Sequence, residues 1–139
     1  MAASFIFEVY TPYRLFFSGS VQAIVLTLTD GEAAIYASHA PLTAPVVPCL
    51  LKIKDAKGKW KTAFTSEGFL EVRNSKTILV SDAAEWPEEI DCERAMAARE
   101  RAEQSLAAAG KLKFEAENAA VSLKRANMRL KAREEGLRK

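Results

Sequence analysis

Four arginines in the last third of the chain have the type and spacing of a phosphate-binding cluster. Arg94 and Arg101 are seven residues apart, which places them on one face of a helix. Arg125 and Arg129 are four apart and would share a face in the same way. Guanidinium groups donate forked hydrogen bonds that suit phosphate oxygens, so the two pairs could grip an anionic ligand if the helices fold back on one another. Spacing alone also fits a solvated, charged helix face, and both interpretations stay open here.

Side chains that commonly catalyse reactions are scarce in this sequence. His39 is its one histidine, too few for the usual metal sites, and no nucleophile elbow accompanies it. The phosphate loop of nucleotide hydrolases, G-x-x-x-x-G-K-[ST], does not occur. Cys49 and Cys92 are the two cysteines, and their separation favours free thiols in a reducing compartment over a metal site. We therefore expect no catalytic residues, no catalytic cofactor and no metal.

The composition changes near Trp86-Pro87, which predicts two domains, 1–87 and 88–139. Phe114 is the single aromatic residue after that point, and every proline lies at or before it. No apolar stretch reaches the length that a bilayer-spanning helix needs, so we expect an intracellular protein that does not insert into a membrane.

The first domain has the period-two pattern and turn signals of β-strands. Phe5, Phe7 and Val9 alternate with Ile6, Glu8 and Tyr10. Further strands are expected at 21–28, 50–54, 60–65, 69–73 and 77–81. Asp30-Gly31, the segment 55–58 and Asn74-Ser75 supply the turns. Short strands at this spacing predict an antiparallel sandwich or barrel. The expected core residues are Val9, Leu28, Ile53, Phe64, Val72 and Leu79.

The second domain has the pattern of two helices, at about 92–108 and 112–135, separated by Ala109-Gly110. Asp91 is a suitable N-cap for the first helix. Each helix has one narrow apolar seam, formed largely by alanines: Ala95, Ala98 and Ala102 in the first, and Ala116, Ala119, Leu123, Ala126 and Leu130 in the second. Small side chains allow close antiparallel packing but bury little surface. The hairpin is therefore either a moving part or a static one docked on the β domain.

Several motifs, in this order and spacing, resemble the epsilon subunit of bacterial F-type ATP synthases. They are Asp30-Gly-Glu-Ala-Ala-Ile-Tyr-Ala-Ser-His-Ala-Pro-Leu42, Gly68-Phe-Leu-Glu-Val72, Ile90-Asp-Cys-Glu-Arg-Ala95 and the tail Leu123–Leu130. The resemblance implies a β-sandwich of about ten strands followed by an antiparallel α-helical hairpin. Ser38, Ala34, Ala37, Cys49 and Glu67 stand where the family commonly has glycine or proline, and we expect the loops there to differ in shape.

The resemblance also implies a function and partners. A non-catalytic subunit of the central stalk would couple rotation to proton translocation and inhibit ATP hydrolysis through a mobile hairpin. The sandwich would bind the gamma subunit and the c ring, and the extended hairpin would reach the alpha and beta subunits. Such a subunit sits peripherally on the cytoplasmic face of the bacterial membrane.

Individual positions carry the family's roles by the same resemblance. Glu32 would contact the c ring, and His39, Pro41 and Leu42 would form an interface motif. ATP would bind as a regulatory ligand, without being hydrolysed, at Glu85, Asp91, Arg94, Ala95, Arg101, Arg125 and Arg129.

A nucleic-acid-binding module with a basic helical tail is the alternative. The net charge of +2 gives it little support, and the many acidic residues among the basic ones of the tail would repel phosphates.

Overall fold

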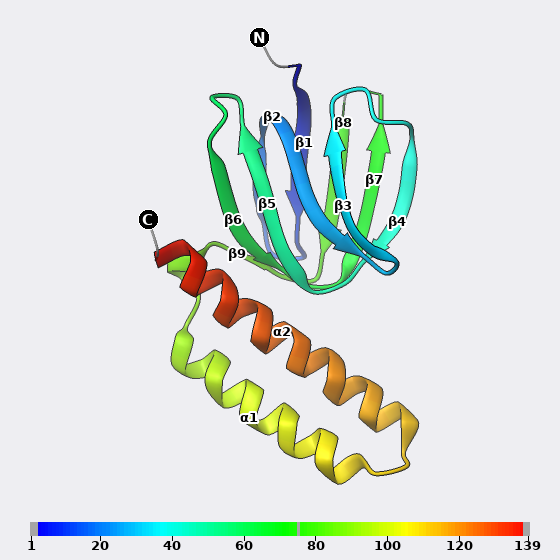
Figure 1. Cartoon of the computed structure of the whole chain (residues 1–139), viewed down its shortest axis with the longest axis vertical. Coiled ribbons are helices and arrows are strands. Elements are labelled where there is room, and N and C mark those ends of the chain that lie inside the picture. The colour runs from blue at the N-terminus through cyan, green and yellow to red at the C-terminus, as the bar shows by residue number, and fades with distance from the viewer. Residues whose placement is uncertain (1–2, 75, 138–139) are drawn as a thin grey trace. The chain divides into compact units, whose positions relative to one another are not determined.

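The computed structural model describes residues 3–74 and 76–137, which form two compact units. The first unit extends to Glu85 and the second begins at Trp86. Figure 1 shows the strands of the first unit and the two helices of the second. The predicted turn at Asn74-Ser75 includes Ser75, which lies outside the described residues.

The first unit is built from nine strands in its described part. They are β1 (Phe5–Tyr10), β2 (Leu15–Leu28), β3 (Gly31–Tyr36), β4 (Leu42–Val46), β5 (Cys49–Asp55), β6 (Trp60–Thr65), β7 (Gly68–Arg73), β8 (Lys76–Ser81) and β9 (Ala84–Glu85). Hydrogen-bonded neighbours follow the order β1-β8-β7-β4-β2-β5-β6-β9, with β3 also beside β2 and a further β1–β2 pairing. The pairings are antiparallel except for β1–β8, which is parallel.

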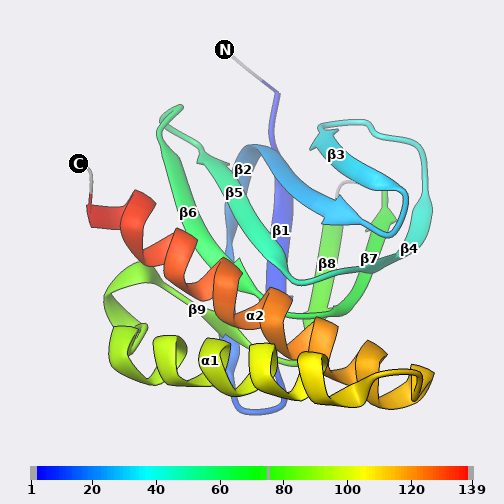
Figure 2. The ribbon, with the colours of Figure 1, turned by 60° about the horizontal axis from the view of Figure 1, so that its bottom comes forward.

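Strand β2 is long enough to belong to both layers of the sandwich. Its first half pairs with β1, and its second half lies between β3 and β5. The register against β5 shifts between Val21 and Ala23, and such an irregularity bends a strand and increases its twist. Figure 2 shows β2 and β5 curving together beside β3 and β6, with β1, β8 and β7 forming the other layer.

The alternating residues of the strands form the core between the layers, as the sequence predicts. Val9, Ile53, Phe64, Val72 and Leu79 are buried, together with the first-strand residues Phe5 and Phe7. The prediction that Leu28 lies in the core is wrong: Leu28 is half-exposed near the end of β2, whereas Leu26 is fully buried.

The second unit is a short 3₁₀ turn followed by two helices. The turn η1 spans Pro87–Glu89, α1 spans Cys92–Ala109 and α2 spans Lys113–Leu137, close to the predicted bounds. Gly110 has φ 54° at the end of α1, a conformation that glycine adopts without strain. Three alanines of each helix are buried along the seam: Ala95, Ala102 and Ala109 in α1, and Ala119, Ala126 and Ala132 in α2. A β-sandwich followed by a helical hairpin is the predicted fold class.

Candidate functional site

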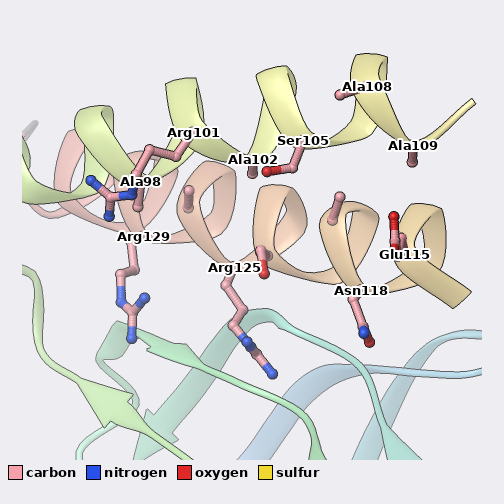
Figure 3. A pocket seen from close by; sticks show the side chains of 13 residues that line it. Ala98, Arg101, Ala102, Ser105, Ala108, Ala109, Glu115, Asn118, Arg125 and Arg129 are labelled. Atoms are coloured by element: carbon pink, nitrogen blue, oxygen red, sulfur yellow. The ribbon is translucent and has the colours of Figure 1, made fainter.

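An open groove follows the hairpin, and both helices supply its lining. Its volume is about 740 Å³, within the range of about 300–1,000 Å³ typical of small-molecule sites. Alanines form much of its surface, and the polar lining residues are Arg101, Ser105, Glu115, Asn118, Ser122, Arg125 and Arg129 (Figure 3).

Three of the four predicted arginines line this groove. Arg101 comes from α1, and Arg125 and Arg129 come from successive turns of α2. In Figure 3 the side chains of Arg125 and Arg129 point in the same direction, away from α1, whereas Arg101 lies along α1. The backbone thus brings the three residues to one groove, and an anionic ligand would have to draw their guanidinium groups together.

Arg94 lies outside the groove lining, although it shares a helix face with Arg101. Seven residues of α-helix advance about 10 Å, so Arg94 is two turns nearer the start of α1. Its side chain is exposed. Arg94 and Arg101 therefore lie on one face of α1 but two turns apart, and they do not meet at one point.

The motif Ile90-Asp-Cys-Glu-Arg-Ala95 belongs to the linker between the sandwich and α1 and to the start of α1. Its other residues have structural roles that explain their types. Asp91 is the N-cap of α1, and its Oδ1 accepts a hydrogen bond from the Arg94 backbone N–H at 3.1 Å. Ile90 is 2% exposed and Ala95 is 3% exposed, the latter within the alanine seam. The pattern Ile-Asp-x-x-Arg-Ala thus begins a helix and packs it, and leaves the Arg94 side chain exposed.

Glu85 lies in the first unit, half-buried in the two-residue strand β9, opposite Phe64 of β6. Because Glu85 and the hairpin belong to different units, the fold of the hairpin alone does not assemble Glu85 with the arginines.

Spacing of the arginines did not identify the uncharged polar lining of the groove. Asn118 and Ser122 continue the Arg125–Arg129 face of α2 toward its N-terminus, and Ser105 lies one turn beyond Arg101 on α1. Extending both faces by two turns would have found them. These groups can hydrogen-bond to the sugar or base of a nucleotide, while the arginines suit its phosphates.

The predicted sandwich positions lie on exposed loops and strand ends. Glu32 follows the predicted Asp30-Gly31 turn as the second residue of β3, and it is exposed and opposite Thr27. His39 is exposed in the loop after β3, and its Nδ1 lies 2.7 Å from the Ala40 carbonyl oxygen. Pro41 is exposed, and Leu42 begins β4 half-exposed.

A second surface feature lies on the outer face of the sandwich, where apolar side chains form a row across five strands. Pro45 of β4 is opposite Phe69 of β7, and Phe69 is opposite Val80 of β8. Val80 is in turn opposite Tyr10 of β1, and Tyr10 is opposite Leu15 of β2. We call Pro45, Phe69, Val80, Tyr10 and Leu15 the apolar row; all five are exposed.

Neither described unit contains a metal-binding cluster or a membrane-spanning element of the helical kind. Among residues 3–74 and 76–137, no group of three or more His, Cys, Asp or Glu side chains could hold a metal ion. In the same ranges, neither helix is long and apolar enough to cross a membrane.

Comparison with solved structures agrees with the fold. A chain of the Euglena gracilis mitochondrial ATP synthase, in a structure of its OSCP/F1/c-ring, superposes with a TM-score of 0.78 at 21% identity, over 99% of this chain and 83% of that one. A chain in the central stalk/c-ring structure of the Tetrahymena thermophila mitochondrial ATP synthase superposes with a TM-score of 0.52 at 16% identity, over 64% of this chain.

Sequence comparison identifies the family. Residues 4–87 match the β-sandwich domain of the ATP synthase delta/epsilon chain, and residues 88–134 match its long α-helix domain. The ATP synthase epsilon chain of Caldanaerobacter subterraneus subsp. tengcongensis is 50% identical over 132 residues, 94% of each chain. That of Caldicellulosiruptor bescii is 49% identical over 104 residues, 75% of each chain. The chain therefore belongs to the epsilon chains of ATP synthase, which are subunits of that complex but not its catalytic ones.

Proposed function

We propose that this chain is a coupling and regulatory subunit of the central stalk, in which the hairpin inhibits ATP hydrolysis and senses ATP. The sandwich binds the gamma subunit and the c ring, on the cytoplasmic face of a bacterial membrane. The hairpin, when it extends, contacts the alpha and beta subunits. ATP bound to the closed hairpin opposes that extension.

The observation that carries this proposal is the arginine-lined groove on a hairpin held together by alanines. All six buried seam residues are alanines, and burying a methyl-sized group contributes about 0.8 kcal/mol, against about 1.5–3 kcal/mol for a leucine. A ligand that contacts both helices can therefore change the balance between closed and open hairpins. It does so only to the extent that it binds the closed form more tightly.

ATP matches the chemistry of the groove. Arg101, Arg125 and Arg129 offer positive charge and forked donors to the phosphates, and Asn118, Ser105 and Ser122 offer hydrogen bonds to the ribose or adenine. Bound phosphates would also reduce the repulsion between the arginines. Arg94, exposed two turns from Arg101, extends the positive face toward the linker.

The apolar row supports a protein partner for the sandwich, and we assign the gamma subunit to it. Phe69 is 62% exposed, Val80 52% and Leu15 50%, and Tyr10 between Val80 and Leu15 makes the row contiguous across the hydrogen-bonded strands. Contiguous apolar surface of this kind marks protein interfaces, whereas single exposed apolar side chains are common anywhere. We assign the contact with the c ring to the exposed Glu32 and the turn before it. We assign the His39–Leu42 segment to a protein interface.

Calorimetric titration of the full chain with ATP tests the nucleotide site. We expect binding in the micromolar to millimolar range without release of phosphate. We expect Arg129→Gln to weaken it at least about tenfold, because a hydrogen bond to a charged group contributes about 1.5–3 kcal/mol. Lys131→Gln is the matched control: it removes one positive charge from the same helix at an exposed position outside the groove. Absence of heat at millimolar ATP, or equal weakening by both variants, would disprove the site.

A further inference from the structure

Helix α2 is longer than its partner, and its last turns reach back to the linker that precedes α1. Helix α2 has 25 residues and α1 has 18. In Figure 1 the red end of α2 lies against the short green segment before α1, which is η1. Two residues of α2 make specific contacts there.

Arg133 forms hydrogen bonds to two backbone carbonyls of the linker. Its Nη1 donates to the Ile90 carbonyl oxygen at 2.8 Å and to the Pro87 carbonyl oxygen at 3.3 Å. Ile90 immediately precedes the N-cap Asp91, so these bonds hold the end of α2 beside the start of α1. Charged donors make stronger hydrogen bonds than neutral ones, and here both acceptors are partly buried.

Gly136, one turn further along α2, packs directly on the ring of Pro87. A Cβ at position 136 would lie 2.5 Å from Pro87 Cγ and nearer still to Pro87 Cβ, well inside van der Waals contact. Gly136 is the next-to-last residue of α2, and its lack of a side chain allows this close approach to Pro87, which is buried.

We propose that Arg133 and Gly136 form a latch on Pro87 and Ile90, which holds the hairpin closed at its linker end. The alanine seam buries little surface, and the latch adds directed contacts between the end of α2 and the linker. Arg133 also continues the Arg125–Arg129 spacing by four residues, so it lies on the same face of α2. Its regulatory consequence rests on the proposed function; the latch itself does not.

Hydrogen–deuterium exchange of the full chain, without nucleotide, tests the latch. We expect Arg133→Gln to raise exchange at the start of α1 and along the last turns of α2 by about tenfold, with the sandwich amides as an internal reference. Lys131→Gln changes the same charge at an exposed position two residues away and should leave exchange unaltered. Equal exchange in these two variants would overturn the proposal.

Gly136→Ala supplies a second test, in which the latch and helix propensity predict opposite results. Propensity alone predicts slower exchange, because alanine favours a helix over glycine. The latch predicts faster exchange, because the new methyl group displaces Pro87. Pro87→Gly in the same chain removes the atoms that the methyl meets, so it should restore part of the protection lost in Gly136→Ala. Slower exchange in Gly136→Ala would contradict the latch.

Measuring ATP hydrolysis by the assembled complex distinguishes the latch from the proposed inhibition of hydrolysis by the hairpin. If both hold, Arg133→Gln should inhibit hydrolysis more strongly than Lys131→Gln, because an open hairpin reaches the catalytic subunits more often. Faster exchange with unchanged hydrolysis would support the latch and would contradict the proposed inhibition of hydrolysis by the hairpin. Unchanged exchange would overturn the latch whatever the ATP titration shows.

Discussion

At the scale of single residues, Asp55 shows how one carboxylate organises the β5–β6 turn. Its Oδ1 accepts hydrogen bonds from the backbone N–H groups of Lys57 and Lys59, each at 2.9 Å. The Lys59 bond contributes most to lowering the pKa of Asp55 below its ordinary value of 3.8, and the Lys57 bond adds to it. Gly58, with φ 85°, completes the turn at a conformation that favours glycine.

This lowered pKa predicts a pH-dependent effect of Asp55→Asn. A depressed folded-state pKa gives stability that is present above the pKa of the unfolded chain and lost as pH falls through the folded value. We therefore expect Asp55→Asn to lower the melting temperature slightly at pH 7, and the difference from the natural chain to vanish in strong acid. Asp55→Ala also removes the side-chain oxygen that accepts the hydrogen bonds, so this variant should remain destabilised both at pH 7 and in strong acid. A pH-independent difference for Asp55→Asn, followed by circular dichroism, would rule out the charge as the cause.

Ser38 shows where sequence reasoning about a single residue falls short. The absence of glycine there predicts a loop of different shape, because side chains disfavour positive φ. Ser38 nevertheless has φ 65°, the one positive φ among the non-glycine residues that the structure describes. The neighbouring bond from the His39 N–H to the Tyr36 carbonyl oxygen, at 3.3 Å, belongs to the same tight turn. Residue type gives a local preference, whereas the closure of the turn is set by strands that flank it.

At the scale of elements, periodicity predicts the strands and helices whose patterns are strong and misses those whose patterns are weak. Strands β1 and β5–β8 follow their alternating residues, and α1 and α2 follow their alanine seams. The first residues of β2 contain Ser18, Gly19 and Ser20, which blur the pattern, so the strand begins earlier than predicted. Strand β4 contains Pro45, and β9 has two residues, so neither has a usable local signal.

Gly68 explains one motif residue that pattern alone cannot. A Cβ at this position would overlap the Val80 carbonyl oxygen and lie 2.8 Å from Ser81 Cα, so β7 and β8 approach each other too closely for any side chain. The sequence marks Gly68 through the resemblance of its segment to the family, but only the pairing of β7 with β8 gives the physical reason.

The apolar row gives a prediction at the same scale. Phe69→Glu places a charge in the middle of the row, where binding would have to desolvate it, and we expect the affinity for the gamma subunit to fall at least about tenfold. Trp60→Glu is the control, because Trp60 is 44% exposed on β6, outside the row. Both chains should keep their far-ultraviolet circular dichroism, and co-purification with gamma measures the difference. Equal recovery of the two variants would remove the row from the interface.

At the scale of the whole molecule, the two units have different kinds of core. The sandwich buries large side chains such as Phe7, Phe64, Leu51 and Leu70, whereas the hairpin seam buries alanines. The change in composition near residue 87 shows this difference in the sequence, and three of the arginines that the spacing singles out, Arg101, Arg125 and Arg129, line one groove. The placement of Arg94, the polar lining and the linker contacts of Arg133 need the helices in three dimensions, because they depend on axial offset and on where α2 ends.

This division predicts that the sandwich is independent of the hairpin in stability but not in regulation. A chain ending after Glu88 keeps every strand and every large buried side chain of the first unit, so it should unfold cooperatively on heating. Complexes that contain it should hydrolyse ATP faster than complexes with the full chain, because the segment proposed to reach the catalytic subunits is absent. Arg133→Gln in the full chain should change hydrolysis in the opposite direction, since it frees the hairpin instead of removing it. Equal hydrolysis rates for complexes with the truncated and the full-length chain, measured with equal occupancy of the subunit, would mean that the hairpin does not inhibit hydrolysis by the complex.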